Sequence, residues 1–524
     1  MKCTFVALGA ENISLEVLSA MLKAHGHRTE LAYDQALFDD KNYLYMPRFA
    51  RLFDQRDDVV EQVVASRPDL VGFSVMTPTY RWALDVAGRI KKRLDVPIIF
   101  GGMHPTTLPE QTIANDCVDM ICVGEGDHAL VDLANAIEAG RVDTSIENLW
   151  FKKDGRVICN EQRPLIDDLD TLPLPDKELF APHVPIKNYY LAVTSRGCPY
   201  ACTYCSLSFQ AKEIARLGGK RLRERSPESV VHELETMRAR YGFEWVDFRN
   251  NTFTANKKWV MAFLELYKER VGLPFKAFAH PSTMDREMAF KLKEAGCFGI
   301  QLGVESYSED VRKNILNRHE SNSEILRTVE SMDEAGLPYS IDYILGIPTQ
   351  NEQELLGAAE FFIRRKMCYR VSPFLLEYLP RLDIIEHGLV HGEITEADVR
   401  ALQDGEHNHY LSTGSMGRDP KKLRFFMGYR LLFRLIPFLP RWASRSLIKR
   451  KLYRVLPYLP TGFVIRILDI LMLFRRHDRD AYTYAKNYWY WLGTRFRRKR
   501  WVSNDETTAR AETPQPQPMP LVSA

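Results

Sequence analysis

Short apolar runs alternate with amphipathic stretches over the first 145 residues. The strand-like runs are residues 3–8, 28–33, 70–75, 96–100 and 119–123. Between them, apolar side chains recur with helical spacing over residues 14–24, 58–65 and 80–94. Continuous apolar strands separated by helices are typical of a parallel sheet covered on both faces. The pattern predicts a doubly wound α/β domain over residues 1–145, with a ligand site at the carboxyl ends of its strands.

A second series of alternating strands and helices follows a connector rich in proline, residues 146–187. The expected strands are residues 190–195, 245–249, 275–279, 299–304, 339–345 and 371–376. The expected helices are residues 229–241, 257–270, 285–294, 323–335 and 352–365. Six strand–helix units predict a partial (β/α)6 barrel over residues 188–400, whose active site lies at the carboxyl ends of the strands.

The pattern changes again after residue 400. A near-repeat of Arg, two apolar residues, Pro, an aromatic residue, Leu and Pro occupies residues 434–440 and 454–460. Its prolines predict short helices with sharp turns, at residues 441–453 and 461–474, in an α-helical region over 401–502. An aromatic-rich run follows at residues 482–491. The last stretch, 503–524, has the composition of a disordered tail.

Charge is distributed unevenly along the chain. Residues 421–500 hold 21 lysines and arginines against three aspartates, a net charge of +18, whereas the whole chain carries +3. Such asymmetry indicates an anionic partner. Basic helices with aromatic and aliphatic faces suit an anionic bilayer; a helical cap on the barrel is the alternative, and no nucleic acid is expected. With no apolar run of transmembrane length, we expect a cytoplasmic protein, with peripheral contact at the inner membrane face left open.

Three cysteines carry the most specific chemistry. Cys198, Cys202 and Cys205 follow a C-x3-C-x2-C spacing. Three thiolates on one loop can hold three irons of a [4Fe–4S] cube and leave the fourth iron open. A structural zinc site needs four ligands, and the other six cysteines are scattered. Length and the lack of a signal peptide argue against a disulfide framework. The spacing favours a cluster over zinc and over ordinary core cysteines.

The same cysteines, with an aromatic residue before the last, resemble the signature of radical S-adenosylmethionine (SAM) enzymes. The resemblance implies that they ligate the cluster, that SAM chelates the fourth iron, and that Tyr204 lies beside the adenine. It further assigns Glu305 and Ser306, of a G-x-E-S element, to SAM. A salt bridge from Glu305 to Arg249 or Arg318 is the structural alternative.

A G-x-P turn at Gly346 and Pro348 matches the element that faces the adenine in that family. Two departures stand out. The turn continues as Thr-Gln-Asn at residues 349–351 instead of Gly-Glu-Thr, and the second barrel strand ends in Asn250-Asn251 instead of Asp-Asp. Both changes remove acidic groups near the site.

Small and polar residues follow the strands of the first domain, where glycine lets a backbone approach a large flat ligand. Together with the cysteine loop, the runs G-G-x-H-P-T and V-G-E-G resemble the cobalamin-binding domain of cobalamin-dependent radical SAM enzymes. The D-x-H-x-x-G motif is absent, so the resemblance implies cobalamin held without a histidine below cobalt, and His104 is a loop contact. The implied cobalamin residues are Ser74, Thr77, Gly101, Gly102, His104, Gly124 and Glu125.

The resemblance implies methylation of an unactivated carbon, in which a 5′-deoxyadenosyl radical removes hydrogen and the methyl group comes from methylcobalamin. The alternatives are an oxidative or ring-forming reaction like that of the anaerobic magnesium-protoporphyrin ester cyclase, or a non-catalytic iron–sulfur or cobalamin-binding protein. The expected partners are a reductant such as flavodoxin or ferredoxin and a small substrate. The basic, aromatic segment points to a lipid or isoprenoid-like molecule.

Overall fold

The computed structural model describes residues 1–39, 46–141, 143–406, 419–458 and 479–502, with a few single residues between them. Its first sheet has seven strands in the order β2-β1-β3-β4-β5-β6-β7. The five predicted strands are all present and parallel: β1 (Lys2–Leu8), β2 (Arg28–Asp34), β3 (Leu70–Ser74), β4 (Ile98–Gly101) and β5 (Met120–Cys122). The strand order reverses beside β1, which places a ligand site at the carboxyl ends of β1 and β3.

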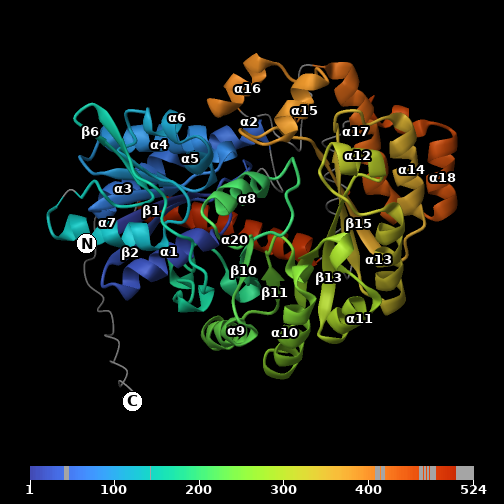
Figure 1. Cartoon of the computed structure of the whole chain (residues 1–524), viewed down its shortest axis with the longest axis horizontal. Coiled ribbons are helices and arrows are strands. Elements are labelled where there is room, and N and C mark those ends of the chain that lie inside the picture. The colour runs from blue at the N-terminus through green and yellow to red at the C-terminus, as the bar shows by residue number, and fades with distance from the viewer. Residues whose placement is uncertain are drawn as a thin grey trace.

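Helices cover both faces of this sheet (Figure 1). The pair α1 (Ile13–Ala24) and α7 (Asp127–Glu138) packs over one apolar core, and α3 (Arg56–Ser66) with α4 (Tyr80–Lys91) packs over a second. Alternation along β1 supplies both cores, since Phe5 faces the first and Val6 the second. The doubly wound prediction is therefore confirmed.

A hairpin extends the first sheet beyond residue 145. Strands β6 (Leu149–Lys153) and β7 (Arg156–Cys159) pair antiparallel with each other, and β6 pairs antiparallel with β5. The sequence analysis assigned these residues to the connector, because two short runs with charged residues carry little periodic signal. Only the proline-rich stretch after Cys159 runs as a connector between the two sheets.

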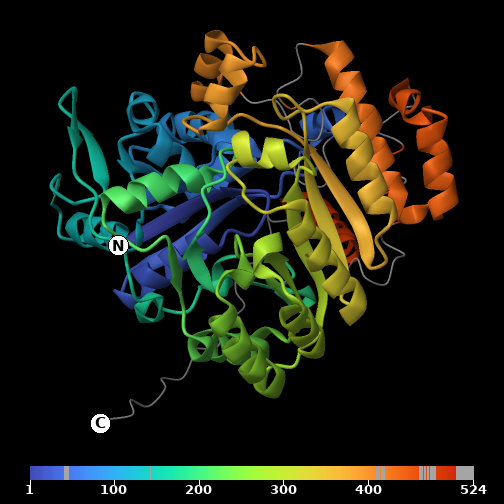
Figure 2. The same cartoon turned by 45° about the vertical axis from the view of Figure 1, so that its right-hand side comes forward.

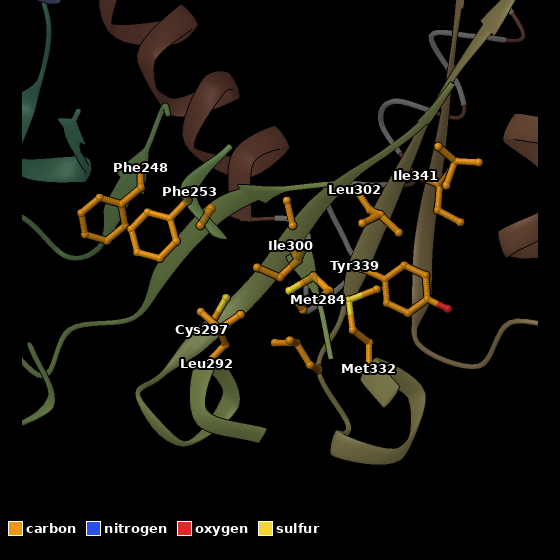
Figure 3. Packing of buried hydrophobic residues seen from close by; sticks show 14 of the residues in the cluster. Phe248, Phe253, Met284, Leu292, Cys297, Ile300, Leu302, Met332, Tyr339 and Ile341 are labelled. Atoms are coloured by element: carbon orange, nitrogen blue, oxygen red, sulfur yellow. The ribbon is translucent and has the colours of Figure 1, made fainter. Parts of the chain in front are cut away.

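The second sheet has six parallel strands in the order β15-β14-β13-β12-β11-β8. These are β8 (Tyr190–Ala192), β11 (Val246–Phe248), β12 (Phe275–Ala279), β13 (Cys297–Glu305), β14 (Tyr339–Leu345) and β15 (Cys368–Leu375). The five predicted helices lie outside them (Figure 2): α9 (Pro227–Tyr241), α10 (Lys257–Arg270), α11 (Arg286–Glu294), α13 (Asn322–Ala335) and α14 (Glu352–Ile363). Buried side chains of strands and helices form one core, including Phe248, Ile300, Leu292 and Met332 (Figure 3). The partial barrel is confirmed.

Two of the carboxyl-terminal helices pack on the barrel, and a third lies between the two sheets. Helix α17 (Pro420–Leu435) places Phe426 and Phe433 in the barrel core, and α18 (Arg441–Lys449) packs against α14. Helix α20 (Arg479–Val502) runs between the two sheets (Figure 1). The predicted tail, 503–524, and most of the predicted helix 461–474 lie outside the described residues. Within the described part of the chain, no helix is both long and apolar enough to span a bilayer.

Helix α20 is tied to both halves through polar contacts. On the side of the first domain, Phe38 N donates to Tyr488 Oη at 3.1 Å, and in the connector the carbonyl of His183 accepts from Trp491 Nε1 at 2.9 Å. On the barrel side, Trp245 Nε1 donates to Thr483 Oγ1 at 3.3 Å. The aromatic, basic run that suggested a membrane surface therefore serves in part as an internal cap.

Candidate active site between the two sheets

A cavity of about 1910 Å³ lies between the carboxyl ends of the two sheets. Its wall takes loops from the first domain, residues beside the cysteine loop, strands of the barrel, and side chains of α17 and α20. Cavities for one drug-sized ligand are about 300–1,000 Å³. The space therefore suits a macrocycle together with further molecules.

Six of the seven residues implied for cobalamin line this cavity: Ser74, Thr77, Gly101, Gly102, Gly124 and Glu125. They come from the ends of β3, β4 and β5. Gly102 needs its φ of +99°, and an added Cβ would lie 2.9 Å from the backbone of Val75. The turn is fixed further because Gly124 N donates to Thr106 Oγ1 at 3.1 Å. The glycine loops thus form one open wall of the cavity.

His104 lies behind that wall. Its side chain is fully buried, stacks on Tyr80 with ring centroids 3.8 Å apart, and has Thr77 Oγ1 3.1 Å from Nδ1. Burial lowers the pKa of His104 to about 4. Because the ring does not reach the cavity, its place in the fold corresponds to a core histidine that supports the loop, and the structure gives no support to direct contact with a ligand.

A buried charge triad stands beside the end of β1. Lys177 Nζ lies 2.7 Å from Glu11 Oε1 and 2.8 Å from Glu16 Oε2, and all three side chains are at most 2% exposed. Burial raises the pKa of Glu16 well above its ordinary value, although Lys177 opposes the rise. Lys177 also donates to the carbonyl of Leu191, so the triad joins the first domain to strand β8.

The cysteine loop begins with a close backbone contact. Strand β9 (Ser195–Gly197) pairs antiparallel with β10 (Leu222–Glu224), and Gly197 has a φ of +87°. An added Cβ there would lie 1.9 Å from the carbonyl oxygen of Arg221. The same oxygen accepts from Cys198 N at 3.0 Å. Only glycine can precede the first cysteine in this geometry.

Contacts with the barrel hold the rest of the loop. Thr203 N donates to the carbonyl of Leu316 at 3.1 Å, and its hydroxyl donates to the carbonyl of Ile315 at 2.6 Å. Asn317 Nδ2 donates to the carbonyl of Ala201 at 2.8 Å. Helix α8 (Ser206–Arg216) starts directly after Cys205. The loop is therefore fixed at both ends and in the middle before any metal binds.

The three thiols fit an iron–sulfur cube. All three are free of disulfide bonds, and burial raises the pKa of Cys202 and brings that of Cys205 to about 12. Cys198 Sγ lies 3.8 Å from Thr252 Oγ1. In the described residues, no three His, Cys, Asp or Glu side chains are grouped to hold one metal ion. A cube does not require such convergence, since each thiolate binds a different iron.

The side chain of Tyr204, a residue of the cysteine loop, lies next to that of Glu305. Arg318 Nη1 donates to Tyr204 Oη at 3.4 Å, and Arg318 Nε donates to Glu320 Oε1 at 2.7 Å. Burial raises the pKa of Glu305 to about 7, although the charge of Arg318 opposes the rise. Glu305 has a φ of +64° at a register shift between β13 and β14. The ion pair of Arg318 is thus with Glu320, and the charge of Arg249 is paired with Asp247.

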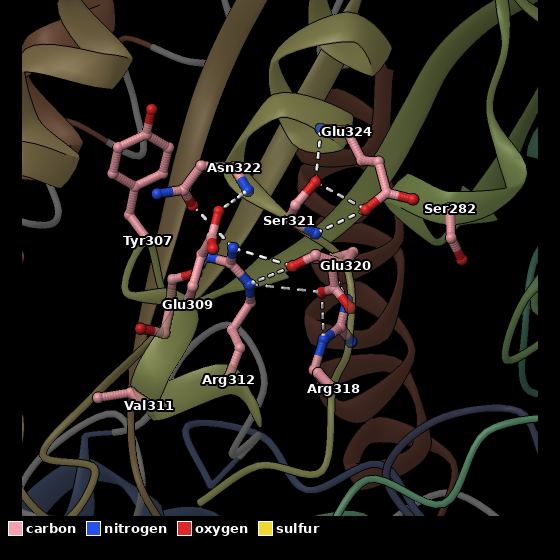
Figure 4. Close-up of polar contacts among 12 residues, drawn as sticks. Ser282, Tyr307, Glu309, Val311, Arg312, Arg318, Glu320, Ser321, Asn322 and Glu324 are labelled. Atoms are coloured by element: carbon pink, nitrogen blue, oxygen red, sulfur yellow. Dashed lines mark hydrogen bonds and ion pairs between the residues drawn. The ribbon is translucent and has the colours of Figure 1, made fainter. Parts of the chain in front are cut away.

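Ser306 faces away from that cluster of side chains. It is fully buried, and its hydroxyl donates to Glu354 Oε1 at 2.5 Å. Its carbonyl accepts from the buried Arg312 Nη1 at 2.6 Å. Arg312 also donates to the carbonyl of Glu320, which closes a polar network behind the strand end (Figure 4). The hydroxyl of Ser306 is thus already hydrogen-bonded to Glu354. Its assignment to SAM stays a prediction.

The turn after β14 shows what replaced the usual acidic residue. Gly346 has a φ of +85°, and its N–H donates to Gln350 Oε1 at 2.8 Å. Gln350 Nε2 donates to the carbonyl of Ile344 at 3.0 Å, so this side chain closes the turn on itself. Pro348 is buried within it. The contacts of Gly346 and Pro348 with SAM remain predictions.

Asn250 has a comparable role at the end of β11. Its Oδ1 accepts from Thr194 N at 3.2 Å, while Nδ2 donates to Thr194 Oγ1 at 2.9 Å and to Ser195 Oγ at 2.6 Å. Asn251 lines the cavity and donates to the carbonyl of Gly197 at 3.2 Å. The two asparagines therefore hold the strand that leads into the cysteine loop.

The sequence analysis did not assign the polar interior of the barrel. Asp247, Lys276, Gln301 and Arg370 line the cavity from four different strands. Gln301 Nε2 donates to Asp342 Oδ2 at 2.6 Å. Single charged residues within otherwise apolar strands, as in Val-Asp-Phe at 246–248, were the signal that could have found them.

An ionic cluster connects the two cofactor loops. Both terminal nitrogens of Arg196 donate hydrogen bonds to the carboxylate of Asp127, each at 2.8 Å. Arg223 Nη2 donates to Glu125 Oε1 at 2.7 Å. Although burial acts to raise the pKa of Glu125, the hydrogen bond from Arg223 and the charge of Arg196 bring it below its ordinary value. Asp127 likewise has a lowered pKa, because Arg196 outweighs burial.

Two family models match the chain in the places that this geometry singles out. The radical SAM superfamily model matches residues 192–362, and the B12 binding domain model matches residues 6–134. The chain belongs to the cobalamin-dependent radical SAM proteins. Its cofactors are accordingly a [4Fe–4S] cluster, SAM and cobalamin, and the cysteine loop and the cavity described above fit them.

Two curated proteins are among its relatives. An uncharacterized methyltransferase of Pyrococcus horikoshii is 30% identical over 315 residues, which cover 58% of this chain and 66% of that protein. The anaerobic magnesium-protoporphyrin IX monomethyl ester cyclase of Rubrivivax gelatinosus is 24% identical over 359 residues, 64% of this chain and 59% of that protein. The chain thus spans a little under two thirds of the length of these relatives.

The fold has a counterpart among solved structures. The cobalamin-dependent SAM radical enzyme OxsB, solved with aqua-cobalamin and SAM bound, aligns with a TM-score of 0.62 and 15% identity over 96% of this chain and 80% of that one. At this identity the likeness concerns the fold, and its extent shows that the helical carboxyl-terminal region belongs to the shared architecture.

Proposed function

We propose that the protein is a radical SAM C-methyltransferase acting on a small molecule within the cavity. The observation that carries the proposal is that one cavity is lined both by the glycine loops of the B12 binding domain and by Gly197 and Ser206, which flank the cysteine loop. Bound there together, the cofactors would supply hydrogen abstraction from a substrate carbon and a methyl group in its place.

The chain's own residues would hold and shield these groups. Cys198, Cys202 and Cys205 would bind the cluster, with Tyr204 and Glu305 beside SAM. Gly101 and Gly124 would let cobalamin approach the backbone. Trp491 of α20, which is 7% exposed, closes part of the cavity wall and would exclude water from the reacting carbon.

Anaerobic reconstitution tests the reaction directly. Wild-type protein with SAM and a reductant such as flavodoxin or ferredoxin is expected to release both 5′-deoxyadenosine and S-adenosylhomocysteine. Cys202→Ala should abolish 5′-deoxyadenosine, whereas Cys159→Ala, at an exposed cysteine outside the loop, should not. Release of 5′-deoxyadenosine without S-adenosylhomocysteine would favour the cyclase-like reaction, and release of neither by wild-type protein would remove the enzyme proposal.

We also propose that α18 and the turns after it touch an anionic bilayer, from which a lipid or isoprenoid-like substrate would come. Four apolar side chains stand exposed there, Trp442 at 75%, Tyr458 at 74%, Val455 at 58% and Leu452 at 40%. Exposed cations surround them: Arg441, Arg445, Lys449, Arg450, Lys451 and Arg454. Aromatic residues interleaved with cations match the interface of an anionic membrane.

Substitution tests this surface better than truncation, because α17 and α20 are part of the core. Trp442→Ser with Tyr458→Ser should weaken binding to vesicles of phosphatidylglycerol and phosphatidylethanolamine by about tenfold or more. Leu52→Ser with Val390→Ser removes equally exposed apolar groups, at 73% and 75%, and should change nothing. Equal binding by both double variants would refute the membrane surface.

A further inference from the structure

The ionic cluster of Arg196, Asp127, Glu125 and Arg223 joins the two loops that hold different cofactors. Arg196 lies on β9, two residues before Cys198, while Glu125 and Asp127 follow β5 in the loop that lines the cavity. Arg196 Nη1 also lies 3.2 Å from Glu125 Oε1. One guanidinium from the barrel side therefore contacts two carboxylates from the cobalamin side.

The contact restrains direction as well as distance. Asp127 receives both terminal nitrogens of Arg196 at 2.8 Å, a bidentate arrangement with parallel hydrogen bonds. Asp127 is only 5% exposed, so water does not compete strongly for its oxygens. Asp127 is also the first residue of α7, which anchors this loop to a long helix.

The second half of the cluster fixes Glu125 independently. Arg223 donates to Glu125 Oε1 at 2.7 Å and to Oε2 at 3.1 Å, and its own side chain is 3% exposed. Arg223 Nη1 also donates to the carbonyl of Ile166 at 2.6 Å. Since β10 carries Arg223 and pairs with β9, both strands beside the cysteine loop are tied to the same cobalamin loop.

Adhesion between the two halves does not depend on this cluster. Lys177 bridges Glu11 to the carbonyl of Leu191, and α20 is hydrogen-bonded to the first domain through Tyr488 and to the barrel through Thr483. Among the inter-domain contacts described, the ion pairs of Arg196 are the ones that lie beside both Cys198, a predicted ligand of the iron–sulfur cluster, and the glycine loop at Gly124. Its loss should shift the cofactors relative to each other rather than separate the domains.

We propose that Arg196 and Asp127 are positioning residues that set where the iron–sulfur cluster lies relative to cobalamin. The proposal rests on both cofactors being bound, as in the family, and does not require that methyl transfer is the reaction. A displacement of about 1 Å in a reacting pair can cost about 100-fold in rate. A shifted iron–sulfur cluster should therefore still cleave SAM, but fewer of the radicals formed should lead to the step that depends on cobalamin.

The experiment compares Arg196→Lys with wild type after loading with iron, sulfide and cobalamin. Lysine keeps the charge and loses the bidentate geometry. Iron and cobalamin content should stay unchanged, while electron paramagnetic resonance should show an altered spin–spin interaction between the reduced cluster and cob(II)alamin. The ratio of 5′-deoxyadenosine to S-adenosylhomocysteine should rise about tenfold. Arg286→Lys, at the exposed Arg286–Glu334 pair, should match wild type in every measurement.

An unchanged spin–spin interaction in fully loaded Arg196→Lys would overturn the proposal. If that variant instead fails to load, the exchanged double variant Arg196→Asp with Asp127→Arg decides. Recovery of loading and of the wild-type spin interaction supports the positioning role, and failure to recover them overturns it. The spin measurement needs no substrate, so wild-type protein that makes no S-adenosylhomocysteine would refute methyl transfer and leave the positioning test valid.

Discussion

The α-carbon of Gly197 sits against the carbonyl oxygen of Arg221 so closely that a Cβ would lie 1.9 Å from that oxygen. Gly197→Ala must therefore break the pairing of β9 with β10 and move Cys198. We expect a loss of about 3 kcal/mol or more in unfolding free energy, with iron and sulfide per chain after reconstitution well below wild type. Metal analysis and urea unfolding measure the two effects.

Gly218 supplies the matched control for that substitution. It also has a positive φ, +71°, but nothing lies within 4 Å of an added Cβ. Gly218→Ala should cost only about 1 kcal/mol and leave iron incorporation intact. Equal loss of iron in both variants would show that backbone strain, and not the contact with Arg221, governs the loop.

Lys177→Met should destabilise the protein by about 3–5 kcal/mol, because it leaves two buried carboxylates without their cation. Lys291 provides a surface comparison, since it also lies near two glutamates, Glu265 at 2.9 Å and Glu294 at 3.6 Å, with 39% of its side chain exposed. Lys291→Met should cost far less than Lys177→Met, because solvent screens the exposed pair. Chemical unfolding curves distinguish the two, and similar losses would contradict the triad's role.

Asp34 introduces a pH dependence at the end of β2. Burial raises its pKa to about 6 from an ordinary value of 3.8. The folded chain keeps this proton up to about pH 6, whereas the unfolded chain releases it near 3.8. The contribution of the Asp34 carboxyl to the free energy of unfolding is therefore greatest below pH 3.8, and it is lost as pH rises through 6.

Asp34→Asn removes that loss while keeping the oxygen that accepts from Ala36 N at 2.8 Å. The variant should exceed wild type in unfolding free energy by up to about 3 kcal/mol at pH 8, with the gain vanishing near pH 4. Thermal or urea unfolding across this range measures it. Asp143→Asn, at an exposed carboxylate, serves as control, and a gain independent of pH would contradict the assignment.

Two tryptophans of α20 should separate stability from ligand binding. Trp491 is 7% exposed and donates to the carbonyl of His183, so Trp491→Ala should cost about 3–5 kcal/mol. Trp489 lines the cavity but is 71% exposed. Trp489→Ala should change stability by less than about 0.5 kcal/mol and alter KM for the substrate more than kcat. An effect of Trp489→Ala on kcat that exceeds its effect on KM would contradict the place of Trp489 in the wall of the ligand cavity.

Much of the fold follows from local pattern. Residues 339–345, five of which are apolar, predicted β14 with the right bounds, because strands of a parallel sheet that is covered on both faces are mostly hydrophobic. The cysteine loop could be predicted as a cluster site because its three cysteines lie within eight consecutive residues. Gly101 and Gly124 both line the cavity, because parallel strands end at one edge of the sheet, and their contact with cobalamin stays a prediction.

What could not be predicted depends on residues distant in sequence. Arg196 and Asp127 are 69 positions apart, and neither has a local signal that marks the other. His104 belongs to a motif, yet its ring packs on Tyr80, a contact decided by the tertiary position of α4. The aromatic run on α20 has the composition of a membrane surface, and only docking between the two sheets shows that Trp491 is buried.

The place of α20 sets an order of assembly. The cavity wall takes side chains from both sheets, yet Trp489 and Trp491 belong to the last described helix of the chain. During synthesis the B12 binding domain and the barrel leave the ribosome first, and the chamber between them lacks that wall until α20 arrives. The chamber is therefore complete only once the last described helix has docked.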